Sequence, residues 1–308
     1  NLASISLFIA AGTTATTTTL TSLGDIVDEA NETVIMTIAA ITPDTDGAIG
    51  TTSQQTVTII DLTAPPTVTL SIVTNSINEK TGTTSTLVTA TLNTKSEKNV
   101  NVSLQTSGTA TEFDIATSTI LKSDYTLNHM IVISPLTLSA SVTLSARNDD
   151  PLDEFDETVI IDMTCDSTCT ETGVQQRTVA IVDETVPPPV TLSVGVGSIT
   201  EKTASTTTVI ASLPASVFSA KEITVTLTTS GSANEIPNST PTGSSDYTLN
   251  HTIKILAGDP SGSVVLTALN DDPLDEPDET VIVDMACDGT CNEATTQQQT
   301  VTIVDETD

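Results

Sequence analysis

The sequence predicts an all-β protein built from tandem Ig-like antiparallel β-sandwiches with Greek-key connections. The first observation is a repeat, since "SDYTLNH" at 123–129 returns at 245–251 and "NDDPLDE" at 148–154 returns at 270–276. The second is composition: aromatic residues make up only 2% of the chain, so the core must come from Val, Ile, Leu and Thr, which favour strands. The third is the alternation of apolar and polar residues in short stretches separated by turn residues.

One complete repeat contains seven such stretches. In order they are TVTLSIV at 67–73, STLVTATL at 85–92, NVNVSLQT at 99–106, LNHMIVIS at 127–134, ASVTLSA at 140–146, ETVIIDM at 157–163 and QQRTVAIV at 175–182. Each is predicted to be a strand with one face in the core, because successive side chains of a strand point to opposite faces. A unit of this size can bury an adequate core without a metal.

Proline marks the boundaries of the repeats. "APP" at 64–66 and "VPPP" at 186–189 predict short, stiff linkers. We therefore expect a partial unit, the C-terminal half of a repeat, at 1–62 and complete units at 66–185 and 188–308.

The partial unit holds only the second half of the repeat. Its segments 3–12, 16–22, 32–40 and 54–61 align with the fourth to seventh strands. The first three strands have no counterpart, which would leave strand edges open. We expect them to come from a longer array upstream or from a neighbouring subunit.

The charge of the chain excludes several classes of partner. The net charge is −31, and only nine residues are Lys or Arg, which excludes nucleic acid as a partner. An anionic membrane surface is disfavoured for the same reason. No apolar run approaches the ~20 residues of a membrane-spanning helix, so no membrane insertion is expected in this segment.

An acidic stretch, "NDDPLDEFDETVIIDM", occupies 148–163 and returns almost unchanged at 270–285. Carboxylates this close repel one another unless something neutralises them. Other acids lie after the first strand, in "SDY", and after the last strand in "VDE", and these loops can meet at one end of a Greek-key sandwich. Calcium takes six to eight oxygen ligands in irregular geometry, so the pattern predicts a calcium site. The alternative is a solvated, solubilising edge.

Taken together, "VTLS", "INEKTG", "SDYTL", the acidic stretch and "TVAIVDE" resemble the Calx-beta domain. This family is known from regulatory loops of sodium/calcium exchangers, an integrin beta subunit and large bacterial surface proteins. The resemblance implies Ca²⁺ as the bound ion. In the first complete unit the implied ligands are Glu79, Asp124, Asp149, Asp150, Glu154, Glu157, Asp183 and Glu184. In the second they are Glu201, Asp246, Asp271, Asp272, Glu276, Glu279, Asp305 and Glu306.

Two departures from the family pattern bear on these sites. The exchangers carry a longer terminal acidic run than "VDET", which implies fewer ions per site here. The partial unit has Gly24 and Asp25 where the pair of Asp residues should be, so a weaker site is expected there.

The four cysteines form two copies of C-x3-C, Cys165 with Cys169 and Cys287 with Cys291. A zinc site needs four ligands, and neither loop offers a His or a third Cys. A disulfide that closes the turn fits better than a free thiol pair, and it indicates an oxidising compartment.

The pattern favours a structural protein over an enzyme. His129 and His251 start equivalent strands, which indicates a structural role, and the paired acids lack the aromatic residues that a glycosidase would use to bind sugar. We expect a calcium-binding repeat region of an extracellular stalk, adhesin or filament, in which calcium stiffens the junctions and neighbouring repeats are the partners. The alternatives are a module that binds a receptor or matrix ligand and a calcium-sensing regulatory segment.

Overall fold

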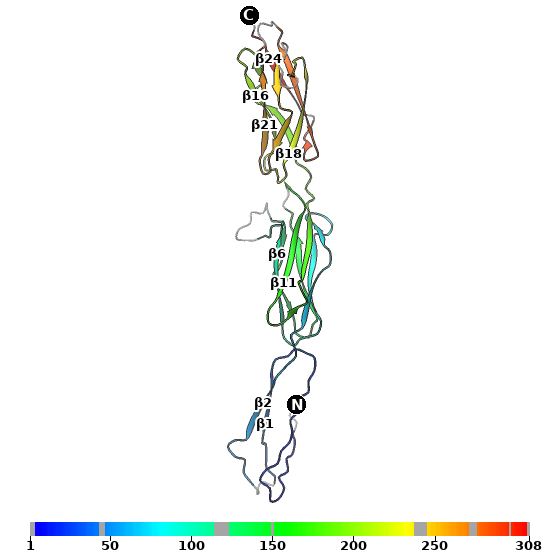
Figure 1. Ribbon diagram of the computed structural model, residues 1–308, viewed down its shortest axis with the longest axis vertical. Coiled ribbons are helices and arrows are strands. Elements are labelled where there is room, and N and C mark those ends of the chain that lie inside the picture. The colour runs from blue at the N-terminus through cyan, green and yellow to red at the C-terminus, as the bar shows by residue number, and fades with distance from the viewer. Residues whose placement is uncertain are drawn as a thin grey trace.

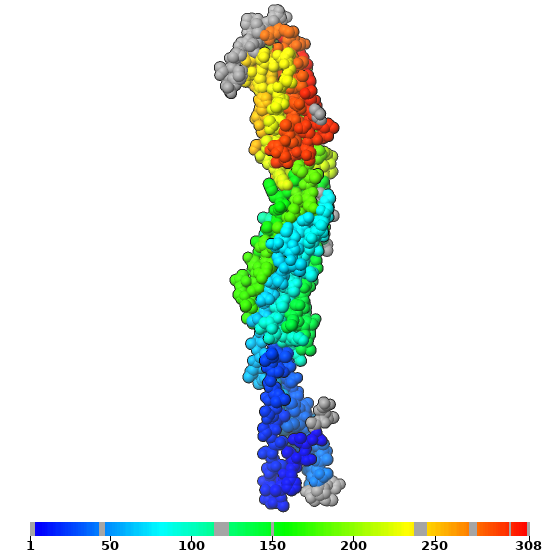
Figure 2. Space-filling view, turned by 90° about the vertical axis from the view of Figure 1, so that its right-hand side faces the viewer, coloured from blue at the N-terminus to red at the C-terminus, as the bar shows by residue number. Residues whose placement is uncertain are grey.

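The structure is a computed structural model that describes residues 4–42, 47–113, 123–148, 151–236, 245–270, 276–295 and 297–306. The fold is all-β, as the sequence predicts, and its units follow one another along a single long axis (Figures 1 and 2). Among the described residues there is no helix with the length and apolarity needed to cross a bilayer.

The first sandwich consists of two five-stranded sheets in the described residues. One sheet has the order β4(Ser76–Asn78), β13(Gln176–Val182), β11(Glu157–Cys165), β6(Val100–Gly108) and β8(Met130–Ile133). The other has the order β12(Thr170–Glu171), β3(Thr67–Ile72), β5(Ser85–Leu92), β9(Ser139–Ala146) and β7(Tyr125–Thr126). The long neighbours pair antiparallel, as in β11 with β6 and β5 with β9.

The second sandwich repeats this arrangement. Its first sheet has the order β15(Ser198–Thr200), β24(Gln298–Val304), β22(Glu279–Cys287), β18(Ile223–Gly231) and β20(Thr252–Ile255). Its second has the order β19(Tyr247–Leu249), β21(Ser261–Ala268), β16(Thr206–Ser212), β14(Pro189–Val194) and β23(Asn292–Glu293).

The core of each sandwich comes from the alternation of apolar residues along the strands. On β11 the inward residues Val159, Ile161 and Met163 are buried, and they share a core cluster with Val102 and Leu104 of β6. Burying such a side chain stabilises the fold by about 1.5–3 kcal/mol. The seven expected stretches all contain strands. Two- and three-residue strands such as β4 and β12 were not expected, because they are too short to show an alternating pattern.

The first 62 residues form a much smaller sheet. Within the described residues 4–42 and 47–62, β1(Glu32–Thr37) and β2(Gln54–Ile59) are the only strands, and they pair as an antiparallel hairpin. The described residues within 4–12 and 16–22, which align with β8 and β9, lie in no strand. In the complete unit β8 pairs with β6 and β9 pairs with β5, and this chain has no counterpart of either partner in its first 62 residues.

Both disulfides expected from the C-x3-C spacing are present. Cys165 bonds to Cys169 and Cys287 bonds to Cys291, each with a Cα–Cα distance of 5.4 Å. Each bond closes the turn that follows β11 or β22, and Cys169 and Cys291 are themselves buried against the cores.

The two sandwiches are joined by more than the proline linker. β10(Leu152–Asp153) of the first sandwich pairs in parallel with β17(Phe218–Ser219) of the second. A strand pair that crosses the boundary fixes the orientation of one sandwich on the other, which a linker alone does not do.

Candidate metal centre

Three acidic residues from three separate loops meet at one end of the first sandwich. Glu79 follows β4, Asp124 precedes β7 and Glu154 follows β10, and one carboxylate oxygen of each lies within 4.8 Å of the others. Glu79 and Asp124 are buried. Such a group of buried anions requires a proton or a cation to be stable.

Asp124 is held in place by the adjacent Tyr125 and by the backbone of Thr111. Tyr125 is buried in the core beside it, and the backbone N–H of Asp124 donates to the carbonyl of Thr111 at 2.8 Å. The backbone N–H of Thr111 in turn donates to Oδ2 of Asp124. The "SDY" sequence therefore fixes a carboxylate at the end of the sheet by anchoring the following aromatic ring.

Glu157, the first residue of β11, extends the cluster. Burial, a hydrogen bond with Asp124 and the negative charges of Asp124, Glu154 and Glu79 raise the pKa of Glu157 to about 9. Its Oε2 atom is buried and meets no hydrogen-bond partner among the described residues. In the absence of a cation, Glu157 therefore keeps its proton at neutral pH.

In the second sandwich Glu201, Asp246 and Glu279 come together, again with oxygens within 4.8 Å of one another. Here the third member is the counterpart of Glu157 at the start of the strand, and not of Glu154. Glu201 and Asp246 are buried. Burial, a hydrogen bond with Asp246 and the charges of Asp246, Glu276 and Glu201 raise the pKa of Glu279 to about 8. Oδ1 of Asp246 and Oε2 of Glu279 are buried without a hydrogen-bond partner in the described part of the chain.

The acids after the last strand of each unit have positioning contacts. Asp183 accepts from the backbone N–H of Glu154 at 2.9 Å, and Asp305 accepts from that of Glu276 at 2.6 Å. These bonds set the acidic loop beside the end of β13 or β24.

Glu184 and Glu306 contact the loop after the first strand. Glu184 accepts from the hydroxyl and the backbone N–H of Thr81 and from the backbone N–H of Lys80 at 2.9 Å, and these bonds lower its pKa. The backbone carbonyl of Glu306 accepts from Nζ of Lys202 at 3.4 Å.

Four of the expected ligands, Asp149, Asp150, Asp271 and Asp272, lie outside the described residues. In the partial unit, Asp25 accepts from the backbone N–H of Val27 at 2.8 Å, a local turn contact.

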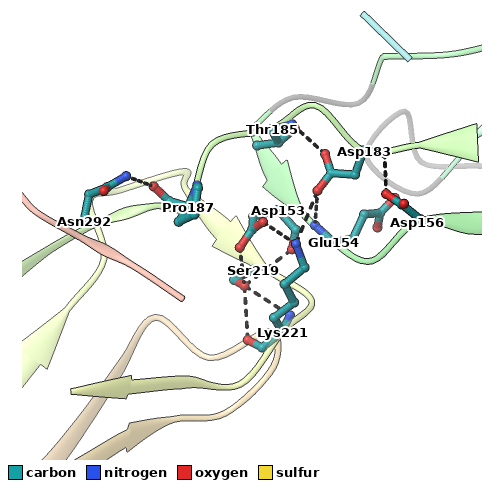
Figure 3. Close-up of polar contacts among 9 residues, drawn as sticks. All are labelled: Asp153, Glu154, Asp156, Asp183, Thr185, Pro187, Ser219, Lys221 and Asn292. Carbon is teal, nitrogen blue, oxygen red and sulfur yellow. Dashed lines mark hydrogen bonds and ion pairs between the residues drawn. The ribbon is translucent and has the colours of Figure 1, made fainter. Parts of the chain in front are cut away.

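Sequence reasoning missed one set of polar residues, at the boundary between the sandwiches. Nζ of Lys221 lies 2.7 Å from Oδ1 of Asp153 and 3.5 Å from Oδ2 of Asp183 (Figure 3). A Ser-x-Lys pattern could have indicated this contact from the sequence. It occurs at equivalent positions of the two complete units, as "SEK" at 96–98 and "SAK" at 219–221, in a chain that has only nine Lys and Arg residues.

No protein-family model matches the chain, and no curated protein matches its sequence. Similar solved structures include CBD12 from CALX1.2, with 12% identity and a TM-score of 0.30 over 77% of this chain and 99% of that one. Adhesin InvE from Yersinia pseudotuberculosis has 16% identity and a TM-score of 0.34 over 77% of this chain and 58% of that one. The Escherichia coli adhesin FdeC has 15% identity and a TM-score of 0.29 over 82% and 68%. At these values the likenesses assign no function.

Proposed function

We propose that the chain is a calcium-binding structural repeat region of an extracellular surface protein, such as a stalk, adhesin or filament subunit. The observation that carries the proposal is a cluster of three acids at one end of each sandwich, brought together from segments that are far apart in the sequence. Two members of each cluster are buried, and burial, followed by the repulsion of the neighbouring carboxylates, raises the pKa values of Glu157 and Glu279. Bound calcium would remove this repulsion.

The donor set fits calcium better than other common metals. Both clusters offer carboxylate oxygens, which hard cations prefer, whereas zinc favours Cys and His. Magnesium demands near-ideal octahedral geometry, whereas calcium accepts the irregular set that separate loops supply. Glu79, Asp124, Glu154 and Glu157 would hold the ion in the first sandwich, and Glu201, Asp246, Glu276 and Glu279 in the second. Calcium would supply the positive charge that the protons of Glu157 and Glu279 otherwise provide.

Two further observations support an extracellular, structural role. Disulfides persist in oxidising compartments, and each complete unit carries one. They disfavour a cytosolic calcium sensor, in which thiols stay reduced. The end-to-end arrangement of the units in Figure 1 suits a spacer whose partners are neighbouring repeats.

Calorimetric titration of the full chain with calcium tests the proposal. We expect two sites with dissociation constants of about 10⁻⁴–10⁻³ M, the range of extracellular calcium modules. Asp124→Asn and Asp246→Asn should each remove one site, because an amide oxygen still accepts the backbone hydrogen bond but carries no charge. Asp259→Asn, at an exposed carboxylate, is the matched control. Absence of binding at millimolar calcium, or full binding in both cluster variants, would overturn the proposal.

A further inference from the structure

The contact between the two sandwiches is built around one buried carboxylate. Asp153 and Ser219 are buried, although they belong to different sandwiches. The carbonyl of Asp153 accepts from the backbone N–H of Ala220 at 2.8 Å, and its Oδ2 accepts from Oγ of Ser219 at 3.3 Å. Nζ of Lys221 donates to its Oδ1 at 2.7 Å. Figure 3 shows Lys221 reaching across the boundary to Asp153 and Asp183.

The same contact is present at the boundary before it. Asp28 of the partial unit is buried and forms a parallel bridge with Ser96 of the first sandwich. Its carbonyl accepts from the backbone N–H of Glu97 at 3.0 Å, and its Oδ2 accepts from Oγ of Ser96 at 2.9 Å. Nζ of Lys98 lies 2.7 Å from its Oδ1. Each bond uses the same atoms as its counterpart at the second boundary.

The loop that supplies Ser and Lys is shaped by its own serine. Oγ of Ser96 accepts from the backbone N–H of Lys98 at 3.0 Å, and Oγ of Ser219 accepts from that of Lys221 at 3.1 Å. The serine hydroxyl thus both turns the loop and binds the incoming Asp. The loop immediately precedes β6 or β18, so a central strand holds it rigidly.

We propose that this Ser-x-Lys loop and the buried Asp of the preceding unit form the interaction surface by which units of this repeat bind one another end to end. The partner is the next unit of the same kind, recognised by a parallel backbone bridge, a hydroxyl and an ammonium group. The lysine, and not a metal ion, neutralises this Asp. The joint shares Asp183 with the surroundings of the first calcium cluster, because Asp183 lies 3.5 Å from Nζ of Lys221 and accepts from the backbone N–H of Glu154. The bonds from Ser219, Ala220 and Lys221 to Asp153 involve no side chain of that cluster.

The position of the two halves makes the contact directional. The first sandwich carries both halves, with Ser96 and Lys98 at the end that faces the partial unit and Asp153 at the end that faces the second sandwich. Such a head-to-tail surface generates an open, linear array. At the first boundary the contact forms although the described residues of the partial unit hold only the β1–β2 hairpin.

The role of the lysine can be tested in the full chain by measuring distances between the sandwiches. Spin labels at the exposed positions Thr143 and Ser263 report the distribution of inter-unit distances. In chelator we expect a narrow distribution for the wild type and a clearly broader one for Lys221→Met. Lys254→Met is the matched control, because Lys254 forms an exposed ion pair with Glu222 in the same sandwich. This control should leave the distribution unchanged.

A double-variant cycle guards against misfolding as the cause. If Lys221 acts through Asp153, then Asp153→Asn combined with Lys221→Met should broaden the distribution no more than either single change. An unchanged distribution in Lys221→Met would overturn the proposal. The proposal would also be overturned if the wild-type distance distribution is broad in chelator and narrows only when calcium is added. In that case calcium, and not Lys221, would hold the two sandwiches together. Calcium binding at the clusters is measured separately, so failure of one proposal leaves the other intact.

Discussion

At the residue scale, Glu157 and Glu279 lie where a buried carboxyl group must keep its proton or meet a cation. Each is the first residue of a central strand, so its backbone is fixed by the pairing of β11 or β22. Burial and the neighbouring acids then raise the pKa of each group far above its ordinary value of 4.5. The protonation of Glu157 and Glu279 should therefore respond both to calcium and to pH.

The first prediction concerns pH. A raised folded-state pKa means that the protonated group stabilises the fold below its unfolded pKa, near 4.5, and that this contribution is lost as pH rises through about 9 for Glu157. For Glu279 the loss occurs through about 8. In chelator, the free energy of unfolding should therefore decrease as the pH rises from near 4.5 to about 9. Saturating calcium should remove this decrease. Denaturant unfolding across this pH range measures it. The double variant Glu157→Gln with Glu279→Gln should show a shallower slope in chelator, and an equal slope would contradict the assignment.

The second prediction follows from the same protonation. Glutamine resembles the protonated glutamate, so Glu157→Gln should preserve the fold in chelator while weakening calcium binding in the first sandwich by about tenfold or more, because charged ligands set affinity. Binding in the second sandwich should be unchanged. Calorimetry and melting curves distinguish these effects. Loss of the fold in chelator would show instead that ionised Glu157 is needed for stability.

At the element scale, the long strands could be predicted from sequence and the short ones could not. The alternation in "ETVIIDM" predicts β11 and its buried Val159 and Ile161, because a period of two residues is visible over seven positions. β10 and β17 are two residues long and pair across a unit boundary, so no local pattern indicates them. The acids of the cluster were recognisable because loops of a Greek-key sandwich meet at its ends. The role of Asp183 and Glu184 in backbone contacts depends on side-chain direction, which sequence does not encode locally.

The third prediction concerns Gly108, where β6 ends beside β11. Its φ is 120°, and a Cβ there would lie 2.1 Å from the carbonyl oxygen of Thr158. Gly108→Ala should therefore lower the free energy of unfolding by about 3 kcal/mol or more, combining backbone strain with overpacking. Gly173→Ala is the control, since its φ is 72° but a Cβ would meet no described atom within 4 Å. It should cost only about 1–2 kcal/mol. Thermal or denaturant unfolding measures both variants. If both lose the same free energy of unfolding, the close approach of Gly108 to Thr158 is contradicted.

At the scale of the whole molecule, the first 62 residues carry apolar side chains at core positions of the repeat, but these side chains are exposed. Leu7, Ile9, Met36, Ile38 and Val57 are between 40% and 55% exposed, whereas the aligned residues of the first complete unit are 1% exposed or less. Those aligned residues are Ile131, Ile133, Ile161, Met163 and Val179. Gly12 has the φ of 81° that Gly258 has in the equivalent turn, so the local geometry of the repeat persists without its partner strands.

The last prediction is that a polypeptide with the pattern of residues 66–126 completes this half unit. In the complete unit β11 pairs with β6, and β13 pairs with β4, so both outer edges of the hairpin β1–β2 match strands from that range. Fusing a copy of 66–126 ahead of residue 1 should slow amide exchange in β1 and β2 to the rates of β11 and β13. It should also abolish the self-association that open edges promote, as measured by light scattering. A fused copy with serine at the positions of Val68, Leu70 and Val88, all core residues, is the control and should do neither. If the unfused chain is already a monodisperse monomer with β1 and β2 fully protected, the half unit needs no partner and the prediction is wrong.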